Sequence, residues 1–486
     1  GLKLLQRICL LAAVPAVLAL CILRTPLRIG ADSSAFSDAV PVSYEVGGEA
    51  VEARETTLPQ GQNELHLRSW TRNGEDVCVM GSFQTAHRTC RSRAIWSAEI
   101  ADEALSVRWF DGQIWHEEPI KVGRYRSNTA FFITGHEVSV LCYTPQVWAL
   151  LENGSRQLTG NWLGFMQTEQ TRDGWRLSLC APKMGSGSAA DFVCVTAADP
   201  NAIDWSREGI PALWSAYRNV GSGRWCFDGY YYTAPPEYYP LGDNYFHALP
   251  GAYITCKIVR VPEDGACRML GISMLDVMRR QQNELGFIPS RAGSTWLKND
   301  YGIEPGYYDT RFNTDLWLAV VNAAENYGVT EWLPQAQRYA DFLVDYAENH
   351  HSPVTTGDAL LVQDYWHPDG SKPTHTSLNH HSNEAIFLYR LAASIGEERY
   401  ALVADRMVRG IDQTVSRWIR PDGNLHYSLS PAGVGGGADY PYLTYNDLTE
   451  LQRLYVKRFG SPDAAIRTLA QTKLNWMRKN NVVILY

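Results

Sequence analysis

The feature that most constrains this chain is a helical segment repeated three times in its C-terminal half. Each copy begins with polar residues, continues as an amphipathic helix and ends at a glycine, and these glycines (Gly328, Gly396 and Gly460) are spaced 68 and 64 residues apart. Glycine suits the left-handed position that ends many helices. A second helical pattern follows each glycine, over about 331–350, 398–416 and 462–480. With a further helix at about 268–284, the repeat predicts helical hairpins curved into an α/α toroid.

The preceding region follows a different periodicity. Residues 64–70 alternate between polar and apolar, Asn73-Gly74 supplies a turn, and Asp111-Gly112 supplies another. Such strand-length runs predict a β-rich sandwich or barrel. We therefore expect an α+β multidomain chain with an N-terminal membrane anchor. Its segments are a signal anchor or transmembrane helix over 1–30, a linker over 31–48, a β-rich cysteine-containing domain over 49–267 and an α/α-toroid domain over 268–486.

The anchor is inferred from an apolar run over residues 8–23, which Leu4 and Leu5 extend to nearly the length of a membrane span. Lys3 and Arg7 precede it, as in a signal sequence, so a cleaved signal peptide is the alternative. An anchor would contact the membrane through residues 4–23 and leave the bulk of the chain in an oxidising compartment: extracellular, periplasmic, or the secretory and Golgi lumen.

Apart from Cys9 and Cys21 in the apolar run, the chain has eight cysteines, all within one half of it, and none follows position 267. An even number confined to one segment favours disulfides, although eight buried thiols are the alternative, and the pairing is not determined by the sequence. The disulfide candidates are Cys78, Cys90, Cys142, Cys180, Cys194, Cys226, Cys256 and Cys267.

The charge balance argues against a nucleic-acid partner, because 44 basic and 52 acidic residues give a net charge of −8 and no long basic run occurs. Aromatic residues make up 12% of the chain, which fits large cores or a carbohydrate-binding surface on which rings stack against sugars. The sequence contains no nucleotide-binding motif and no trusted set of metal ligands, so we expect no cofactor and no metal.

Long polar and aromatic loops lead into the repeated helices. Thirteen residues before the terminal glycines stand Asp315, Asn383 and Asp447, which should ring one face of the toroid. They either cap the helices or line a cleft built from the loops. Four histidines (His367, His375, His380 and His381) crowd the second loop, where one could serve as an acid or base or simply form hydrogen bonds in a packed loop.

Three short segments of these loops resemble the D-glucuronyl C5-epimerase family, the enzymes of heparan and heparosan modification. They are Lys372-Pro373-Thr374-His375-Thr376-Ser377-Leu378-Asn379, Asn424-Leu425-His426-Tyr427, and Asp439-Tyr440-Pro441-Tyr442-Leu443-Thr444-Tyr445-Asn446. Asp364-Tyr365 stands nearest to the place of the family's glutamate–tyrosine pair. The resemblance covers about a quarter of the chain at residue level.

The resemblance implies inversion at C5 of a uronate, where a base removes the α-proton on one face and an acid returns one on the other. The implied catalytic residues are Tyr427, Tyr442, Tyr445, Asp364 and His375. A tyrosine can act so if nearby cations lower its pKa. The implied substrate-binding residues are Arg291, Lys298, Tyr308, Arg311, Trp366 and Arg420. Packing is the alternative for any one tyrosine.

The sequence thus predicts a membrane-anchored, glycan-modifying protein whose partner is an acidic, uronate-containing polysaccharide. Two alternatives stay open: a polysaccharide lyase or glycoside hydrolase of the α/α-toroid type, and a non-catalytic assembly or glycan-binding protein on the same scaffold. The sequence also leaves open whether the chain forms a homo-oligomer or a subunit of a membrane complex. The enzymatic hypotheses require that aromatic segments near 307, 365 and 427–445 meet around one opening.

Overall fold

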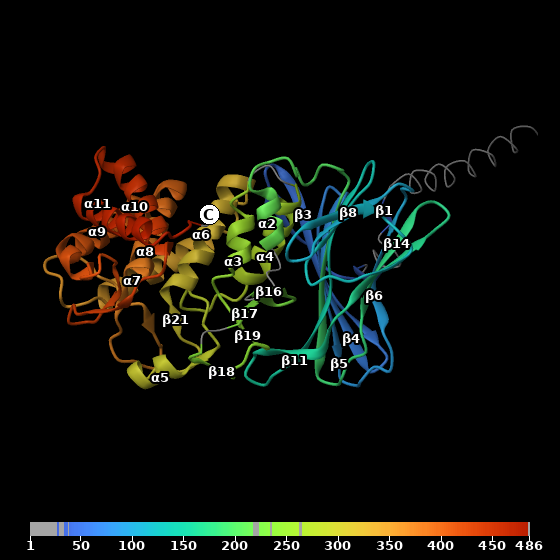
Figure 1. Ribbon diagram of the computed structural model, residues 1–486, viewed down its shortest axis with the longest axis horizontal. Coiled ribbons are helices and arrows are strands. Elements are labelled where there is room, and N and C mark those ends of the chain that lie inside the picture. Colours follow the sequence, from blue (N-terminus) through green and yellow to red (C-terminus); the bar gives the residue numbers. More distant parts are fainter. Residues whose placement is uncertain are drawn as a thin grey trace, which may run out of the picture.

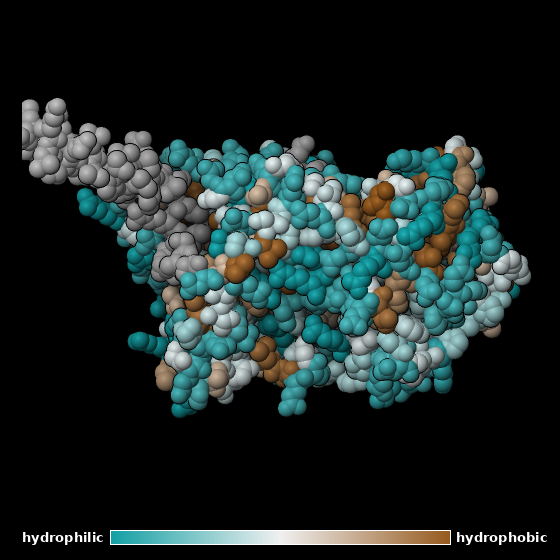
Figure 2. All heavy atoms as spheres, turned by 180° about the vertical axis from the view of Figure 1, so that it is seen from behind, coloured by the Kyte–Doolittle hydropathy of each residue, from teal (hydrophilic) through white to brown (hydrophobic). Residues whose placement is uncertain are grey.

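The computed structural model describes residues 27–28, 34–36, 38–216, 223–233, 236–261 and 265–484. Strands dominate one half of the molecule and helices the other, and the short hairpins near residues 223–248 lie between them (Figure 1). This is the mixed architecture of antiparallel sheets and helices that the change in periodicity predicts. The face seen in Figure 2 is mostly hydrophilic, with hydrophobic side chains in separate areas, since most apolar surface is packed inside.

The larger sheet has thirteen antiparallel strands among the described residues. These are β2 (Val42–Val46), β3 (Glu49–Gln60), β4 (Asn63–Arg72), β5 (Asp76–Thr85), β7 (Ser106–Phe110), β8 (Trp115–Pro119), β10 (Phe131–Thr134), β11 (Ser139–Leu150), β12 (Arg156–Leu163), β15 (Ser188–Ala197), β16 (Gly223–Cys226), β17 (Gly229–Tyr232) and β19 (Tyr245–Ala248). The smaller sheet contains β1 (Leu27–Arg28), β6 (Arg93–Ile100), β9 (Gly123–Tyr125), β13 (Phe165–Gln170) and β14 (Trp175–Ala181).

The two faces of the larger sheet are buried against different layers. Because side chains alternate along a strand, Val79 and Phe83 of β5 pack with Trp96 of the smaller sheet, whereas Cys78 and Met80 of the same strand pack with helix α4. The predicted Asn73-Gly74 turn joins β4 to β5, and both residues adopt positive φ (52° and 69°). The strand-rich half is therefore a sandwich covered on one side by a helix.

The helices lie mainly in the second half of the chain. They are α2 (Ile210–Ala216), α3 (Tyr253–Ile258), α4 (Gly265–Arg279), α5 (Thr295–Tyr301), α6 (Thr310–Tyr327), α7 (Leu333–Asn349), α8 (Leu378–Ile395), α9 (Glu398–Trp418), α10 (Leu443–Phe459) and α11 (Ala464–Lys479). Short strands also occur in the loops between the helices. They are β21 (Tyr308–Asp309), which pairs with β22 (Tyr365–Trp366), and the three-stranded group of β23 (Thr376–Ser377), β24 (His426–Leu429) and β25 (Gly435–Ala438). A further pair is β18 (Tyr238–Tyr239) with β20 (Gly293–Ser294).

The three helical hairpins predicted from the repeat are present. Helices α6, α8 and α10 pack side by side in one row, and each is followed by a helix of a second row, α7, α9 and α11. The terminal glycines Gly328, Gly396 and Gly460 cap the first-row helices with φ of 74°, 72° and 79°, which a residue with a β-carbon adopts only at a cost. Consequently the loops before all three first-row helices open at the same end of the row.

Helix α4 ties the helical half to the larger sheet. Its Asp276 is fully buried and accepts hydrogen bonds from the Trp70 indole (2.9 Å) and the Tyr44 hydroxyl (3.1 Å). Tyr44 lies in β2, inside the segment 31–48 that the sequence analysis assigned to a linker, so that part of the assignment is wrong. The alternating, half-apolar Val42–Val46 pairs with β3, and this pairing outweighs the small polar residues around it.

Two further expectations concern the anchor and the cysteines. The apolar run at 4–23 lies outside the described residues, and within the described ranges no helix is both long and apolar enough to cross a bilayer. None of the eight described cysteines forms a disulfide, so that prediction is wrong. Most of them occupy core positions, and the buried thiol of Cys78 has a pKa raised to about 12 by burial, as expected for an inert packing residue.

Candidate active site

The aromatic segments near residues 307, 365 and 427–440 meet above the first-row helices. The ring of Tyr365 lies 6.1 Å from that of Tyr307 and 5.7 Å from the imidazole of His375. Tyr427 in turn lies 6.0 Å from His375 and 5.7 Å from Tyr440. Three loops that are distant in the sequence therefore contribute to one cluster of packed rings.

Strand alternation decides which aromatic residues face this cluster. In the β21–β22 pair, Tyr308 is opposite Trp366 and Asp309 is opposite Tyr365, so each pair shares a face. Tyr308 and Trp366 pack against Phe342 and Tyr346, and the Tyr308 hydroxyl bonds to that of Tyr339 in the core. Tyr308 and Trp366, two predicted substrate-binding residues, therefore pack against the helical core. Each is the strand neighbour of a residue that faces the cluster, and neighbours in a strand point to opposite faces.

A carboxylate, an imidazole and a phenol form a chain at the centre of the cluster. Nδ1 of His375 lies 2.7 Å from the Tyr301 hydroxyl, and Nε2 lies 3.3 Å from Oδ2 of Asp364, at ion-pair distance but without hydrogen-bond alignment. Asp364 is fully buried and also accepts hydrogen bonds from the backbone N–H (2.8 Å) and the hydroxyl of Ser377. The Trp296 ring stacks on the imidazole at 5.4 Å. The His375 imidazole is therefore positioned by Tyr301, Asp364 and Trp296 together.

The buried carboxyl groups differ in their protonation. Burial raises the pKa of Asp364, but His380, His375 and Ser377 outweigh it, so the pKa lies below its usual value. Burial, with the charge of Asp364, raises the pKa of Asp309 to about 8 although the Asp309 carboxylate accepts the Phe312 N–H (2.9 Å) as the cap of α6. Burial likewise raises the pKa of Glu384 well above its ordinary value. At neutral pH Asp364 is therefore ionised and Asp309 is mainly neutral, while burial favours the neutral form of Glu384.

The tyrosines of the cluster keep their protons. Burial raises the pKa of Tyr427 above its usual value, and the charges of Asp364 and Tyr440 add to the effect. Burial also raises the pKa of Tyr301, which the hydrogen bond to His375 partly offsets. The cation-lowered tyrosine pKa that the family resemblance implies is thus absent at these two positions. A tyrosine with a raised pKa needs a neighbouring base to act as one itself, and the Tyr301 hydroxyl has such a base in Nδ1 of His375.

Arg311 links the N-terminal ends of the three first-row helices. Its guanidinium lies 3.1 Å from Asp315 and 2.6 Å from Asp447, and Asp315 accepts a hydrogen bond of 2.9 Å from Asn383. The positions predicted from the glycine spacing therefore do lie together on one face. Because two carboxylates already occupy the guanidinium, Arg311 is placed as a structural cation rather than as an open ligand for a uronate.

The remaining predicted residues make contacts outside the Asp364–His375–Tyr301 group. Arg291 and Lys298 are exposed and bind Gln281 (3.2 Å) and Glu304 (2.9 Å), respectively. Arg420 bonds to the carbonyl of Gly437 (2.9 Å). Tyr442 and Tyr445 lie at the beginning of α10 and are partly buried, and Tyr440 is the residue of that segment whose ring meets Tyr427.

Sequence reasoning missed Tyr301, Trp296 and Asp309 as site residues. Tyr301 and Trp296 belong to the short helix α5 inside the first long loop, and no spacing rule links them to His375, 74 residues away from Tyr301. Asp309 could have been singled out, since it directly precedes a repeated helix and follows two tyrosines.

Further aromatic side chains extend the cluster toward the strand-rich half. The rings of Tyr232, Tyr253 and Phe312 lie 6.2–6.5 Å from one another, and Tyr253 is 39% exposed. The Tyr238 hydroxyl lies 3.2 Å from that of Tyr307 and links the two groups. Over the described part of the chain, no three histidine, cysteine, aspartate or glutamate side chains are arranged to hold a metal ion.

Comparison with known proteins gives only distant structural likenesses. No family model and no curated protein sequence matches the chain. A family 76 glycoside hydrolase from a bovine Bacteroides thetaiotaomicron strain is 11% identical with a TM-score of 0.38, covering 90% of this chain and 78% of that one. A D-mannose isomerase is 13% identical (TM-score 0.37, 49% of this chain, 62% of that one), and the cellobiose 2-epimerase of Spirochaeta thermophila is 14% identical (0.37, 51% and 64%). The chain thus spans under two thirds of the isomerase and the epimerase, and at these TM-scores its function must be argued from its own residues.

Proposed function

We propose that this protein is a glycan-modifying enzyme that moves a proton at a sugar carbon, with a uronate-containing polysaccharide as substrate and C5 epimerisation as the reaction. The observation that carries the proposal is the Asp364–His375–Tyr301 chain, in which a partly exposed phenol contacts a buried imidazole backed by a buried carboxylate. In hydrolases, a carboxylate that supports an imidazole in contact with a hydroxyl group activates that hydroxyl as a nucleophile or base.

The chain provides a base despite the high pKa of Tyr301. With its own ring proton on Nε2, which lies 3.3 Å from Oδ2 of Asp364, His375 accepts the Tyr301 proton on Nδ1 while the phenolic oxygen accepts the C5 proton of the uronate. The C5–H and Tyr301 O–H bonds break, and a new O–H bond and an imidazole N–H bond form. The resulting imidazolium is stabilised by the ionised Asp364, whose pKa lies below its usual value.

An acid is available from a second direction. Tyr427, held protonated by its raised pKa, contacts the same imidazole ring as Tyr301 and could return a proton to the opposite face of C5. Asp309, with a pKa of about 8, is mainly neutral near pH 7 and so adds little repulsion toward a uronate carboxylate. A neutral Asp309 thus reduces the electrostatic repulsion that a chain of negative net charge exerts on an anionic substrate.

The test is solvent exchange. The full chain is incubated with an unsulfated glucuronate polymer in deuterated water, and deuterium at C5 is measured by NMR and mass spectrometry. Deuterium without chain cleavage supports the proposal. Tyr301→Phe should reduce the rate about 10²–10⁴-fold, the usual range for loss of an acid–base group. Tyr455→Phe, which removes a hydroxyl on α10 near Phe459, is the matched control and should exchange like the wild type.

Other outcomes would redirect the assignment. A product that absorbs in the ultraviolet would indicate elimination by a lyase. Equal exchange by Tyr301→Phe and the wild type would exclude Tyr301 as the base. Binding of the polymer without exchange or cleavage would leave the glycan-binding alternative.

One observation favours a hydrolase as the second candidate. Asp309 and Asp364 have pKa values shifted in opposite directions, which is the division between an acid and a base or nucleophile in glycosidases. Both are almost fully buried beneath the aromatic rings, at 2% and 0% exposure, so a sugar would have to displace those rings to reach them. Release of reducing ends from the polymer would support this alternative.

A further inference from the structure

A second region of the molecule has the features of a ligand site. A groove of about 600 Å³ lies in the strand-rich half and shares no lining residue with the Tyr301 cluster. Its lining is polar, charged and aromatic rather than purely apolar: Ser106, Arg108, Glu117, Thr134, Asn201 and Asp204, together with Pro200, Ile203 and Trp205. Nothing in the proposed proton transfer uses these side chains.

The sheet register explains how the polar wall is built. Ser106 is opposite Thr134 and Arg108 is opposite Glu117 on the neighbouring strands β10 and β8, and Ser106 and Arg108 are two positions apart on β7. All four side chains therefore project from the same face of the sheet. The segment 200–205 forms the other wall.

The charges of the groove favour a neutral ligand. Arg108 and Glu117 form an ion pair at 2.7 Å and offset each other, and the guanidinium also covers the Trp205 ring at 4.4 Å. Asp204 contributes a further carboxylate, which accepts hydrogen bonds from Ser206. The net charge of the lining is thus negative, which opposes an anionic polymer, while its hydroxyl, amide, carboxylate and guanidinium groups suit a ligand rich in hydroxyls.

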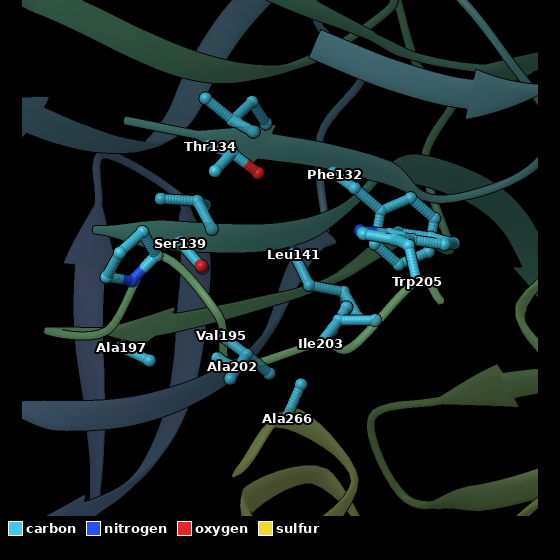
Figure 3. A pocket seen from close by; sticks show the side chains of 13 residues that line it. Phe132, Thr134, Ser139, Leu141, Val195, Ala197, Ala202, Ile203, Trp205 and Ala266 are labelled. Atoms are coloured by element: carbon cyan, nitrogen blue, oxygen red, sulfur yellow. The ribbon is translucent and has the colours of Figure 1, made fainter. Parts of the chain in front are cut away.

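An apolar slot opens beside the groove. It shares Thr134, Pro200, Ile203 and Trp205 with the groove, and its volume of about 20 Å³ is close to that of a single small group. Figure 3 shows Phe132 and Trp205 at one end, the hydroxyls of Thr134 and Ser139 near the other, and Ala266 of α4 facing the slot from below. A methyl group adjoining a polar group matches such a slot.

We propose that the groove and slot together bind an N-acetylated amino-sugar unit of a neutral oligosaccharide. The acetyl methyl group enters the slot between Ile203 and Ala266, the acetamide meets the hydroxyl of Thr134, and the sugar hydroxyls bind along the groove. This is a binding site for a glycan, separate from the proton-transfer site and independent of its chemistry.

The experiment uses two probes that share a β-1,4-linked backbone. Chitopentaose carries an acetamido group on each sugar, and cellopentaose carries a hydroxyl there. Isothermal titration of the full chain should show chitopentaose binding at least about fourfold more tightly, the contribution of one buried methyl group. Equal affinities, or no measurable binding of chitopentaose, would overturn the proposal.

Three variants locate the binding. Ala266→Leu and the smaller Ala266→Val both fill the slot that would receive the acetyl methyl group, so each should abolish the preference for chitopentaose. Thr134→Val removes the hydroxyl that meets the acetamide and should weaken chitopentaose binding. Ala438→Leu, at an exposed position of β25, is the control for the added side chain and should retain the preference.

Thermal melting checks folding, and Ala266→Val decides if Ala266→Leu unfolds. Tyr301→Phe should bind chitopentaose like the wild type, which separates failure here from failure of the proposed reaction. Retained preference in a folded Ala266→Val would overturn the assignment.

Discussion

The Tyr301 hydroxyl lies 2.7 Å from Nδ1 of His375 although 74 residues separate them in the sequence. Helix α5 brings the phenol to the site, and the loop before α8 brings the imidazole. The contact couples a partly exposed group to a buried one, so a proton can pass between solvent-accessible and enclosed parts of the cluster.

Replacing Asp364 by asparagine should separate charge from packing. Asp364→Asn keeps the size of the side chain but removes the negative charge that stabilises a protonated His375 at 3.3 Å. We expect C5 exchange to fall at least about 10²-fold because the imidazole becomes a weaker base. An unchanged exchange rate in the folded variant would show that Asp364 serves folding alone.

Asp309 should make the protein less stable as the pH rises. Its pKa is about 8 in the folded state and near 3.9 when unfolded, so between these values the folded state binds more protons. Stability contributed by the neutral form is present below about pH 4 and is lost toward pH 8, by up to about 1.4 kcal/mol per pH unit. Asp309→Asn should flatten this dependence in urea unfolding measured from pH 5 to 8. A parallel slope in both proteins would contradict the assignment.

His380 and His381 should act in the opposite direction. Burial lowers the pKa of each to about 4, below the ordinary histidine value of about 6.5. The unfolded state therefore takes up more protons between pH 6.5 and 4, and the protein loses stability as the pH falls through this window. His381→Gln should weaken that acid-induced loss, whereas substitution of the exposed His87 should not change it. The midpoint of urea unfolding at each pH provides the measurement.

Lys473 should hold the loop that carries Tyr427 and Tyr440. Its ammonium group is fully buried and contacts Asp439 (2.9 Å), the Asn424 amide oxygen (2.8 Å) and the Tyr440 carbonyl (2.6 Å). Lys473→Met leaves Asp439 buried without its cation, and we expect a loss of about 3–5 kcal/mol in the free energy of unfolding. Lys479→Met, at an exposed position on the same helix, should change it by less than about 0.5 kcal/mol. Similar losses in both variants would refute the role of the buried contacts.

The sequence by itself determined the local elements. Glycine caps, strand alternation and the Asn73-Gly74 turn act over a few residues, so the helix ends and the antiparallel strands could be predicted. The repeat spacing can be read directly along the chain, so the hairpins and the common helix end that carries Asp315, Asn383 and Asp447 could be predicted as well.

Only the tertiary structure decided which side chains meet. Tyr308 and Trp366 face the core while Tyr365 and Asp309 face the cluster, because a one-residue shift in a β-strand reverses the face and the sequence does not state which face is open. The contact between Tyr301 and His375, and the packing of Cys78 and its neighbours as thiols, depend on how separate segments fold together. Such long-range pairing is set by burial of the whole core rather than by any short pattern.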